Sequence, residues 1–501
     1  MIFRDWLKEL DYTLLQGSVD VETEDVIYDS RKAAPGKVFV AMKGIRVDGH
    51  SFIPQVLKAG VRVLVTERPV EEELKNSGLS EEELKQVTVV MVEEGRHALA
   101  LLSAARFDHP AKKLVMIGVT GTKGKTTTTH MIRAILLAAG KKVGMIGTTG
   151  TVIGDVVTPT LNTTPESYEL HQAFAQMVEA GCEYAVMEVS SQGIKMHRTD
   201  GLYFNYAIFT NISPDHIGPG EHADFEEYLY YKTRLLNMCG IGLVNKDDKH
   251  APQIIKAANC ELYTYSEESK EADFVASDIR YVSQPDFVGT EFHISGKYDM
   301  EVRLGIPGLF NVVNALAAVS VCSFLGLDQA RISHALENIR VNGRMEIVYT
   351  SERCTVLVDY AHNAVSMESL LSTLRDYKPK RLVCVFGCGG NRSKDRRYSM
   401  GEIGGKMADL SIITADNSRY EKVEDIIADI RGSIEKTGGK FIEIPDRREA
   451  IRYSILHAQR GDMVAVIGKG HEDYQEINGV RHHFLDREVI EETVKELGEK
   501  A

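Results

Sequence analysis

The 501-residue sequence is poor in cysteine, proline and tryptophan. Its seven cysteines are odd in number and form no Cys-x-x-Cys pair, which argues against both a disulfide framework and a zinc knuckle. Only 13 prolines occur, in a composition with 43% hydrophobic and 26% charged residues, which excludes collagen-like and low-complexity chains. We expect reduced, mostly buried thiols in a globular protein of about three domains, at roughly 150 residues per domain.

The sequence also lacks an excess of positive charge and long apolar runs. A formal net charge of -13 argues against a nucleic-acid-binding body. No apolar run approaches the roughly 18 residues that a membrane span needs, and the first ten residues carry charges where a signal peptide has its apolar core. We therefore expect a cytoplasmic, monomeric protein with small-molecule substrates and with neither nucleic-acid nor membrane partners.

The most informative stretch is residues 118–129, GVTGTKGKTTTT. It lies between an apolar strand-like run and a helical pattern, where glycine-turn N–H groups and a helix N-terminus bind anions. Lys125 can then reach the terminal phosphates and Thr126 can hold magnesium. The strict P-loop pattern has a glycine where Val119 stands, so this is a variant of the motif. We predict a nucleoside triphosphate site, with contacts from Gly121, Thr122, Lys123, Gly124, Lys125, Thr126 and Thr127.

An acid and a lysine downstream are candidates for metal chemistry. Glu188 interrupts a near-continuous apolar strand, which is costly unless the carboxylate is paired or bound to metal; in a P-loop protein we favour magnesium. Lys232 lies on the inward side of a helical pattern over 225–236. Such a lysine usually extends toward solvent, whereas burial beside a metal would lower its pKa and favour covalent chemistry. His216, judged alone, is more often structural.

One polar loop has a purely structural interpretation. In residues 161–166, LNTTPE, Thr164 precedes Pro165, which predicts a helix with threonine as its N-cap and proline at its first position. Capping explains this loop without a function.

The alternation of strands and helices predicts an α/β fold with three domains. Residues 1–110 form a small α/β unit, 111–340 a central P-loop domain with a parallel sheet, and 341–501 a Rossmann-like, doubly wound domain. Residues 250–305 either complete the central sheet or form an appendage. Ligand loops lie at the carboxyl ends of parallel strands, and four polar segments follow strands of the third domain, at 359–363, 387–392, 416–419 and 468–472.

Taken together, these motifs resemble the Mur ligase family, the ATP-dependent amide-forming enzymes of peptidoglycan precursor synthesis. The resemblance covers nearly the whole chain. The family's GxxGTxGKT loop is present at 118–126 and explains the displaced glycine. The family's strand acid matches Glu188, its NxxxDH segment matches residues 211–216, and its helix lysine matches Lys232. Its NxxN segment matches Asn311 with Asn314, its GRxE segment matches Arg344 with Glu346, and its DYAH segment matches residues 359–362.

The resemblance implies a catalytic set of Lys125, Glu188, His216 and Lys232. Magnesium would be held by Thr126 and Glu188, and a second magnesium would lie near His216. Lys232 would be carbamylated and so present a carboxylate to the metal. For ATP, Arg344 and His362 would complete the nucleotide site on domain closure, with Asn311 and Asn314 near the adenine.

Within the family, the first domain is similar to that of enzymes adding the third peptide residue to UDP-N-acetylmuramoyl-L-alanyl-D-glutamate. Two residues depart from the pattern, Gln192 after the paired serines and Met196 in place of a glutamine. By this resemblance the UDP-sugar, UDP-MurNAc-dipeptide, would be bound by Tyr28, Ser30, Ile45, Arg46, Val47, Asn162, Thr163, Thr164, Ser190, Ser191 and Arg198.

The amino acid that is added follows from a second family motif. Members that add meso-diaminopimelate carry Asp-Asn-Pro-Arg, and here residues 416–419 are Asp-Asn-Ser-Arg; Asn391 also stands where aspartate is usual. Lysine has no distal carboxylate and would leave the arginine unpaired, so we favour meso-diaminopimelate. The implied contacts are Arg392, Asp416, Asn417, Ser418, Arg419, Gly468 and Glu472.

Four alternatives stay open. They are the same ligase acting on L-lysine or another amino acid, a folylpolyglutamate synthetase-like amide ligase, a cyanophycin-type ligase, and a regulatory ATP-binding protein that keeps the fold without the activity. Loss of the metal or lysine positions would indicate the last of these, and all of those positions are present.

Overall fold

The computed structural model describes residues 1–44 and 47–498. It contains two compact units, which are described separately: residues 1–265 with 320–325, and residues 266–319 with 326–501. Within the described residues, no helix is both long enough and apolar enough to cross a membrane.

The first unit begins with a five-stranded sheet in the order β1-β5-β4-β3-β2. Side chains alternate across it, as expected for a strand: Val38 and Val40 pack with α5, whereas Phe39 packs with α2 on the opposite face. The elements are α1 (Phe3–Trp6), β1 (Thr13–Gln16), β2 (Asp25–Ile27), β3 (Lys37–Val40), α2 (Ile53–Lys58), β4 (Val63–Thr66), α3 (Glu71–Lys75), α4 (Glu81–Lys85), β5 (Thr88–Met91) and α5 (Gly95–Arg106).

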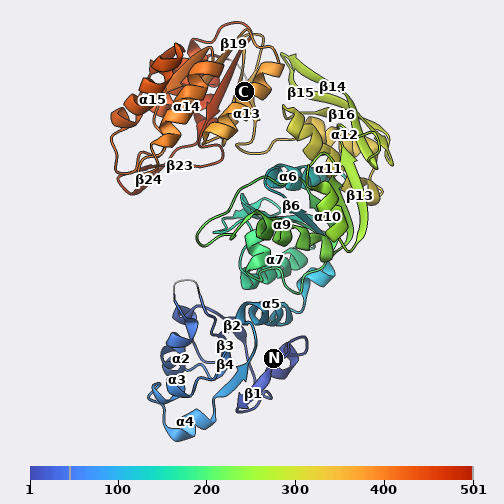
Figure 1. The fold of residues 1–501 in the computed structure, drawn as a ribbon, viewed down its shortest axis with the longest axis vertical. Helices are drawn as coiled ribbons and strands as arrows, with labels where there is room; N and C mark the ends of the chain where they lie inside the picture. Colours follow the sequence, from blue (N-terminus) through green and yellow to red (C-terminus); the bar gives the residue numbers. More distant parts are fainter. Residues whose placement is uncertain (45–46, 499–501) are drawn as a thin grey trace. The chain divides into compact units, whose positions relative to one another are not determined.

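The same unit continues with strands in the order β13-β12-β11-β6-β10-β7-β8-β9. Strands β6, β7 and β10 to β13 run parallel, and β8 and β9 are antiparallel. Helix α6 covers one face of this sheet and α7 and α9 the other (Figure 1). The elements are β6 (Val115–Thr120), α6 (Lys125–Ala138), β7 (Val143–Gly147), β8 (Gly150–Ile153), β9 (Val156–Thr158), α7 (Ser167–Glu179), β10 (Tyr184–Glu188), α8 (Ser191–Lys195), β11 (Phe204–Phe209), α9 (Phe225–Thr233), β12 (Cys239–Asn245), α10 (Ala251–Ala257) and β13 (Glu261–Ser266).

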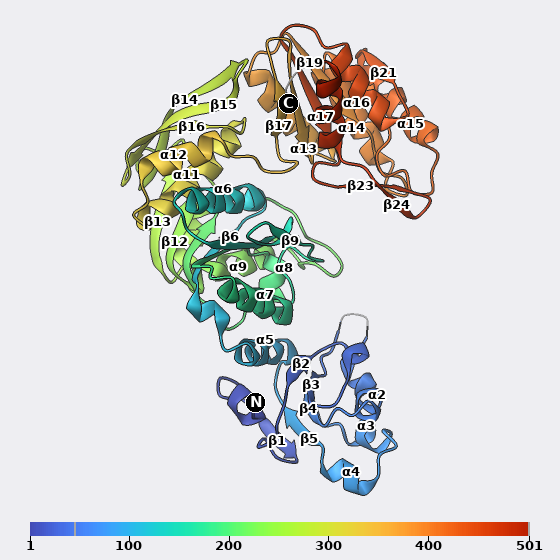
Figure 2. The same ribbon diagram turned by 180° about the vertical axis from the view of Figure 1, so that it is seen from behind.

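The second unit contains an antiparallel meander and a doubly wound sheet. The meander consists of β14 (Phe274–Gln284), β15 (Phe287–Gly296) and β16 (Met300–Leu304), followed by α11 (Leu309–Phe324) and α12 (Gln329–Glu337). The sheet has the order β17-β18-β22-β19-β20-β21, with β17 antiparallel and the other strands parallel. Helices α13 to α15 cover one face (Figure 1) and α16 and α17 the other (Figure 2). This confirms the predicted α/β fold class.

This sheet domain contains two parts besides the central alternation of strands and helices. Strand β21 and helix α16 form an additional strand–helix pair, and β23 and β24 form a hairpin after β22. The elements are β17 (Glu346–Thr350), β18 (Cys354–Asp359), α13 (Ala364–Asp376), β19 (Arg381–Phe386), α14 (Asp395–Met407), β20 (Leu410–Ile413), α15 (Val423–Thr437), β21 (Phe441–Glu443), α16 (Arg447–Leu456), β22 (Asp462–Ile467), β23 (Tyr474–Ile477), β24 (Val480–His483) and α17 (Asp486–Glu496).

The predicted N-cap at Thr164 is wrong. Helix α7 begins at Ser167, with Glu166 at the N-cap position and no side-chain capping hydrogen bond. The hydroxyl of Thr164 instead donates to the carbonyl oxygen of Glu188 (3.0 Å) and accepts from the backbone N–H of Ser190 (2.9 Å). The loop is therefore bound to the end of β10 rather than to its own helix.

A buried ion pair joins α16 to α17. Arg447 and Asp486 are both fully buried and form two hydrogen bonds, of 2.7 and 2.6 Å. The guanidinium also donates to the carbonyl oxygens of Ala415 and Ile467 at the ends of two sheet strands. Its charge is thereby compensated inside the protein.

Replacing Asp486 by alanine is expected to destabilise this domain by about 3–5 kcal/mol, because the change leaves a buried guanidinium without its counter-charge. Urea unfolding would measure the loss. Glu492→Ala is the control, because it removes the exposed partner of Arg448, and such a pair contributes roughly 0–1 kcal/mol. Equal effects of the two changes would contradict the assignment.

Candidate active site

The P-loop is held against the end of β11. The amide of Thr122 donates to the backbone oxygen of Asn211 (2.8 Å), and the amide of Lys123 donates to the Oδ1 atom of the same residue (2.9 Å). At Gly121 a Cβ atom would lie 1.9 Å from the Thr210 hydroxyl, and Gly124 has a φ of 87°. Glycine is required at both positions, the first for close approach and the second for its left-handed backbone.

Two lysines converge on this loop. The Nζ atoms of Lys125 and Lys232 lie 2.9 and 2.8 Å from the same carbonyl oxygen, that of Gly121. Lys232 is buried, with 2% of its surface exposed, and its Nζ lies 4.6 Å from the centre of the Tyr228 ring. The prediction that Lys232 faces inward is confirmed. Its burial, together with the nearby charge of Lys125, holds the pKa of Lys232 well below the usual value, which favours the neutral amine.

Glu188 ends β10 beside the P-loop. It is 1% exposed, and its carboxylate accepts hydrogen bonds from the Thr126 hydroxyl (3.0 Å), the Thr148 amide (2.9 Å) and the Thr148 hydroxyl (3.2 Å). A Cβ on Gly147 would lie 2.3 Å from the carboxylate, so this glycine permits the close approach. Among the described residues no lysine or arginine forms an ion pair with Glu188, so a cation could satisfy its charge.

His216 lies at the exposed end of the site. Its Nδ1 atom is 3.3 Å from a carboxylate oxygen of Glu221, and its ring centre is 6.1 Å from that of Tyr228. Tyr228 is therefore a shared neighbour of His216 and Lys232. In the part of the chain that the structure describes, His216 makes no hydrogen bond to Glu188 or Lys232. The structure therefore does not bring this predicted metal ligand into direct contact with those two residues.

Three of the predicted UDP-sugar contacts, Thr163, Thr164 and Arg198, are linked by hydrogen bonds to the end of β10 around Glu188. The Thr163 hydroxyl lies 3.1 Å from that of Thr148, which also contacts Glu188. Arg198 donates to the Thr164 carbonyl oxygen (3.0 Å) and pairs with Glu166 (2.7 Å). This link places the predicted sugar-binding loop and the strand carboxylate in one hydrogen-bonded group.

The remaining predicted UDP-sugar contacts are more dispersed. Ser190 accepts from the Gly193 amide and caps α8, and Ser191 lies 2.9 Å from the Nε2 atom of the buried His222. Tyr28 donates to Glu169 and lines a cavity of about 150 Å³ with Asp29 and Lys32. Ser30 begins a short 3-10 helix, and Asn162 and Val47 are exposed; Ile45 and Arg46 lie outside the described residues.

The predicted amino-acid contacts meet at the carboxyl edge of the doubly wound sheet. The amide of Asn417 donates to Glu472 (2.9 Å), and Lys469, also fully buried, lies 3.2 Å from the same carboxylate oxygen. Arg419 donates to the Gly390 carbonyl oxygen (2.8 Å), and its Nε atom is 3.5 Å from Glu476.

Four further members of this predicted set belong to the same loops. Asp416 and Ser418 are buried, and a Cβ on Gly468 would lie 2.9 Å from the Asp416 carboxylate. Arg392 is exposed and has no ion-pair partner among the described residues. Together these groups could bind a ligand with both ammonium and carboxylate groups.

The predicted nucleotide contacts of the second unit also lie close to one another. Asn311 and Asn314 are buried and share a helix face, joined by a hydrogen bond of 3.2 Å. Asn311 also lies 3.8 Å from the sulfur of Met345, next to Arg344. Arg344 lies over the ring of Tyr360 at 4.8 Å, and the same ring is 4.8 Å from that of His362.

Sequence reasoning missed four residues of these groups, namely Thr148, His222, Tyr228 and Lys469. Thr148 had a usable signal, because it directly follows β7 at the carboxyl edge of the parallel sheet, where ligand loops lie. Tyr228 lies in the helical pattern over 225–236, which gives no reason to expect a polar role, yet its hydroxyl lies 3.0 Å from that of Thr122. Lys469 had the same signal as Thr148, because it lies in segment 468–472 after β22. His222 carries no such signal, because its buried contact with Ser191 joins residues 31 positions apart.

Comparison with known proteins gives three consecutive matches to sequence models of one family. The model "Mur ligase family, catalytic domain" matches residues 23–107, "Mur ligase middle domain" matches 119–322, and "Mur ligase, glutamate ligase domain" matches 343–470. These matches confirm that the chain has three domains. The exact boundaries at residues 110 and 340 remain a prediction.

Similar proteins and structures span nearly the whole chain. The UDP-N-acetylmuramoyl-L-alanyl-D-glutamate--2,6-diaminopimelate ligase of Caldanaerobacter subterraneus is 39% identical, over 98% of each chain. The ligase of that name from Clostridium perfringens is 37% identical, over 98% of this chain and 99% of the relative. A solved structure of a ligase of that name is 30% identical, with a TM-score of 0.72 and coverage of 95% and 96%.

A more distant likeness concerns the fold alone. Folylpolyglutamate synthase of Mycobacterium tuberculosis, solved with ADP and AMPPCP, is 18% identical, with a TM-score of 0.57 over 74% of this chain and 92% of the other. That likeness covers 74% of this chain, whereas the two relatives above cover 98% of it. The motifs, the three matched domains and the full-length identity of 37–39% therefore assign this chain to the Mur ligase family of ATP-dependent amide ligases.

Proposed function

We propose that this chain joins 2,6-diaminopimelate to UDP-N-acetylmuramoyl-L-alanyl-D-glutamate, with hydrolysis of ATP to ADP and phosphate, in peptidoglycan precursor synthesis. The observation that carries this proposal is the 39% identity, over 98% of both chains, to a relative that bears this activity in its name. The grouping of Arg419 and Glu472 at one sheet edge supports the choice of amino acid.

The reaction requires neutralisation of negative charge. ATP phosphorylates the free side-chain carboxylate of the D-glutamyl residue, the incoming amine attacks the acyl phosphate, and the tetrahedral intermediate loses phosphate. Because the first step brings two anions together, positioned positive groups contribute most. Lys125 extends from the P-loop to the β- and γ-phosphates, and the P-loop amides and the N-terminus of α6 bind phosphate oxygens.

The donor set beside the P-loop fits magnesium. Glu188 is buried, has no ion pair within residues 1–44 and 47–498, and lies 3.0 Å from the Thr126 hydroxyl. Hard oxygen donors of this kind suit Mg²⁺. When bound, the ion neutralises phosphate oxygens. Thr148 orients the Glu188 carboxylate through two hydrogen bonds.

Lys232 is proposed to carry a carbamate. An ammonium group at this position would repel both Lys125 and a metal ion, whereas the neutral amine favoured by its burial can add carbon dioxide. The carbamate carries a negative charge, so this modification reverses the unfavourable charge. His216 is proposed to lie near a second magnesium ion, on the exposed side of Tyr228.

The amino-acid pocket contains groups that suit both ends of diaminopimelate. Arg419 and Arg392 would bind carboxylate, and Glu472 would bind the distal ammonium. The ammonium group of Lys469 and the side-chain amide of Asn417 contact the Glu472 carboxylate. These contacts hold the carboxylate in position. Ser418 replaces the usual proline, and lysine is therefore the competing substrate that must be tested.

The test is phosphate release by the purified protein with ATP, magnesium, UDP-N-acetylmuramoyl-L-alanyl-D-glutamate and a panel of amino acids. We expect release with diaminopimelate and at least about 100-fold lower kcat/KM with lysine, because lysine has no distal carboxylate to pair with Arg419, whose side chain is 22% exposed. Equal turnover with both would refute the pocket assignment. Release with a folate in place of the UDP-sugar would refute the function.

Changing Arg419 to alanine is expected to raise the KM for diaminopimelate by about 10- to 100-fold, since a charge-assisted hydrogen bond contributes roughly 1.5–3 kcal/mol. The KM for ATP should stay the same. Arg460→Ala is the matched control, because Arg460 is a largely exposed arginine of the same domain. An unchanged KM for diaminopimelate would remove Arg419 from the pocket.

A further inference from the structure

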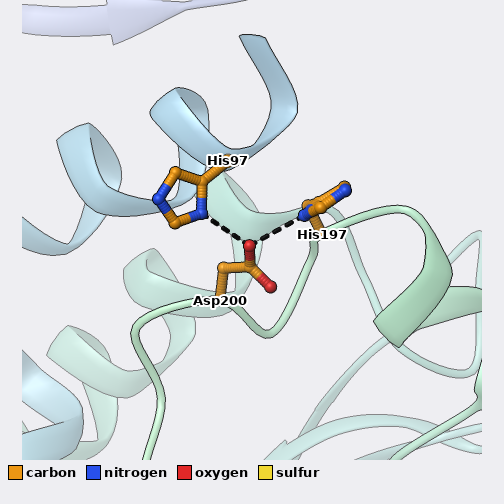
Figure 3. Close-up of side chains that lie close together, drawn as sticks. All are labelled: His97, His197 and Asp200. Carbon is orange, nitrogen blue, oxygen red and sulfur yellow. Dashed lines mark hydrogen bonds and ion pairs between the residues drawn. The ribbon is translucent and has the colours of Figure 1, made fainter. Parts of the chain in front are cut away.

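Two histidines and an aspartate converge at a point that the proposed reaction does not use (Figure 3). The Nδ1 atoms of His97 and His197 lie 2.6 and 2.8 Å from the same oxygen of Asp200. One ligand atom from each residue lies within 4.8 Å of the others. His97 lies on α5 of the first domain, whereas His197 and Asp200 lie on the segment that follows α8, about 100 residues later.

The donor chemistry is that of a transition-metal site. Two imidazole nitrogens and one carboxylate oxygen suit Zn²⁺ and its chemical relatives, whereas Mg²⁺ prefers an all-oxygen shell. Zinc bonds of about 2.0–2.2 Å separate neighbouring ligand atoms by roughly 3.3 Å, so small side-chain rotations would open the present cluster. The side chains are 43%, 38% and 21% exposed, which leaves one side open for a water molecule as the fourth ligand.

We propose that His97, His197 and Asp200 bind a divalent transition-metal ion of the Zn²⁺ class, which ties α5 of the first domain to the segment carrying Arg198. Arg198 is adjacent to His197 and contacts Glu166 and the Thr164 carbonyl oxygen. The ion therefore fixes the position of a segment that holds a proposed UDP-sugar contact. Without a metal, the same three side chains form only a hydrogen-bonded cluster.

The test uses the full-length protein, stripped of metals by a chelator and kept in excess Mg²⁺, which occupies oxygen-rich sites. Co²⁺ is titrated as a spectroscopic probe of nitrogen-containing sites, and Zn²⁺ is then added as a competitor. We expect one Co²⁺ per chain with visible ligand-field absorption, and displacement of that ion by Zn²⁺. Absence of such binding would overturn the proposal.

Three variants locate the site. Asp200→Asn, His97→Gln and His197→Gln should each weaken Co²⁺ binding by at least about tenfold, because even indirect contacts to a metal site contribute 10- to 100-fold in affinity. His482→Gln is the control, because His482 is an exposed histidine of the second unit and should leave the titration unchanged. Binding that persists in all three cluster variants would also overturn the proposal.

A thermal measurement separates the metal from the hydrogen-bonded cluster. Zn²⁺ should raise the melting temperature of the wild type, by mass action, but not that of Asp200→Asn. Equal melting temperatures of the wild type with and without Zn²⁺ would support the cluster alone and reject the ion. Because no ATP or UDP-sugar is present, these results do not depend on the proposed ligase activity.

Discussion

Replacing Lys232 by methionine is expected to lower kcat by about 100- to 1,000-fold, the range found when one preorganised electrostatic group is removed from an active site. Folding should be unaffected or favoured, because methionine fills a similar volume and no amine then has to be buried. This combination of lost activity and retained stability separates a chemical role from a structural one.

The reason lies in the chemistry of a neutral, buried amine. Its nitrogen lone pair attacks the carbon of CO₂, a nitrogen–carbon bond forms and one proton is released, which leaves a carbamate with a charge of -1. An ammonium has no free lone pair, so the low pKa that burial and Lys125 impose on Lys232 is a precondition of the reaction. The Gly121 carbonyl oxygen, 2.8 Å away, holds the amine in the site.

The measurement is carbon-13 NMR of the full-length protein in labelled bicarbonate. The wild type should give a carbamate signal that disappears in Lys232→Met. Lys256→Met is the matched control, because Lys256 is an exposed helix lysine of the same unit and should leave both the signal and kcat unchanged. A fully active wild type without the signal would eliminate the carbamate.

The parts of the site that could be predicted from the sequence are those encoded locally. The P-loop, Glu188 and Lys232 each lie in a short local pattern: a glycine-rich loop, an apolar strand and an amphipathic helix. The helical period then predicts which face of its helix Lys232 occupies. The inward position of Lys232 follows from its spacing to Phe225, Tyr228 and Leu229, and the structure confirms it. That spacing alone leaves open whether the side chain is buried or extends toward solvent.

The parts that could not be predicted depend on distant contacts. Thr164 looks like an N-cap because its neighbours are Thr163 and Pro165, yet its hydroxyl is bound by residues 24 and 26 positions later. No local sequence pattern shows that these distant residues bind the hydroxyl in place of the helix N-terminus. The cluster of His97 and Asp200 spans 103 positions, and each of its members alone is an ordinary surface residue.

Replacing Glu188 by glutamine is expected to raise the magnesium concentration needed for half-maximal activity at least about tenfold and to lower kcat by about 100- to 1,000-fold. The two side chains have almost the same shape. The glutamine oxygen can still accept hydrogen bonds from the Thr126 hydroxyl and the Thr148 amide, which now lie 3.0 and 2.9 Å from one carboxylate oxygen. The change therefore removes the negative charge and leaves most of the local geometry.

Loss of charge at Glu188 has a further consequence for stability. A carboxylate that is 1% exposed and has no ion pair among the described residues is unfavourable in the absence of a cation, so Glu188→Gln should be at least as stable as the wild type without magnesium. Magnesium with an ATP analogue should then stabilise the wild type more than the variant, because the ligand binds only the folded state. Glu179→Gln, an exposed change on α7, is the control and should preserve the wild-type response. If Glu188→Gln kept the wild-type magnesium dependence in both activity and thermal stability, Glu188 would not be a metal ligand, and its three hydrogen bonds would serve only to close the end of β10 against the P-loop.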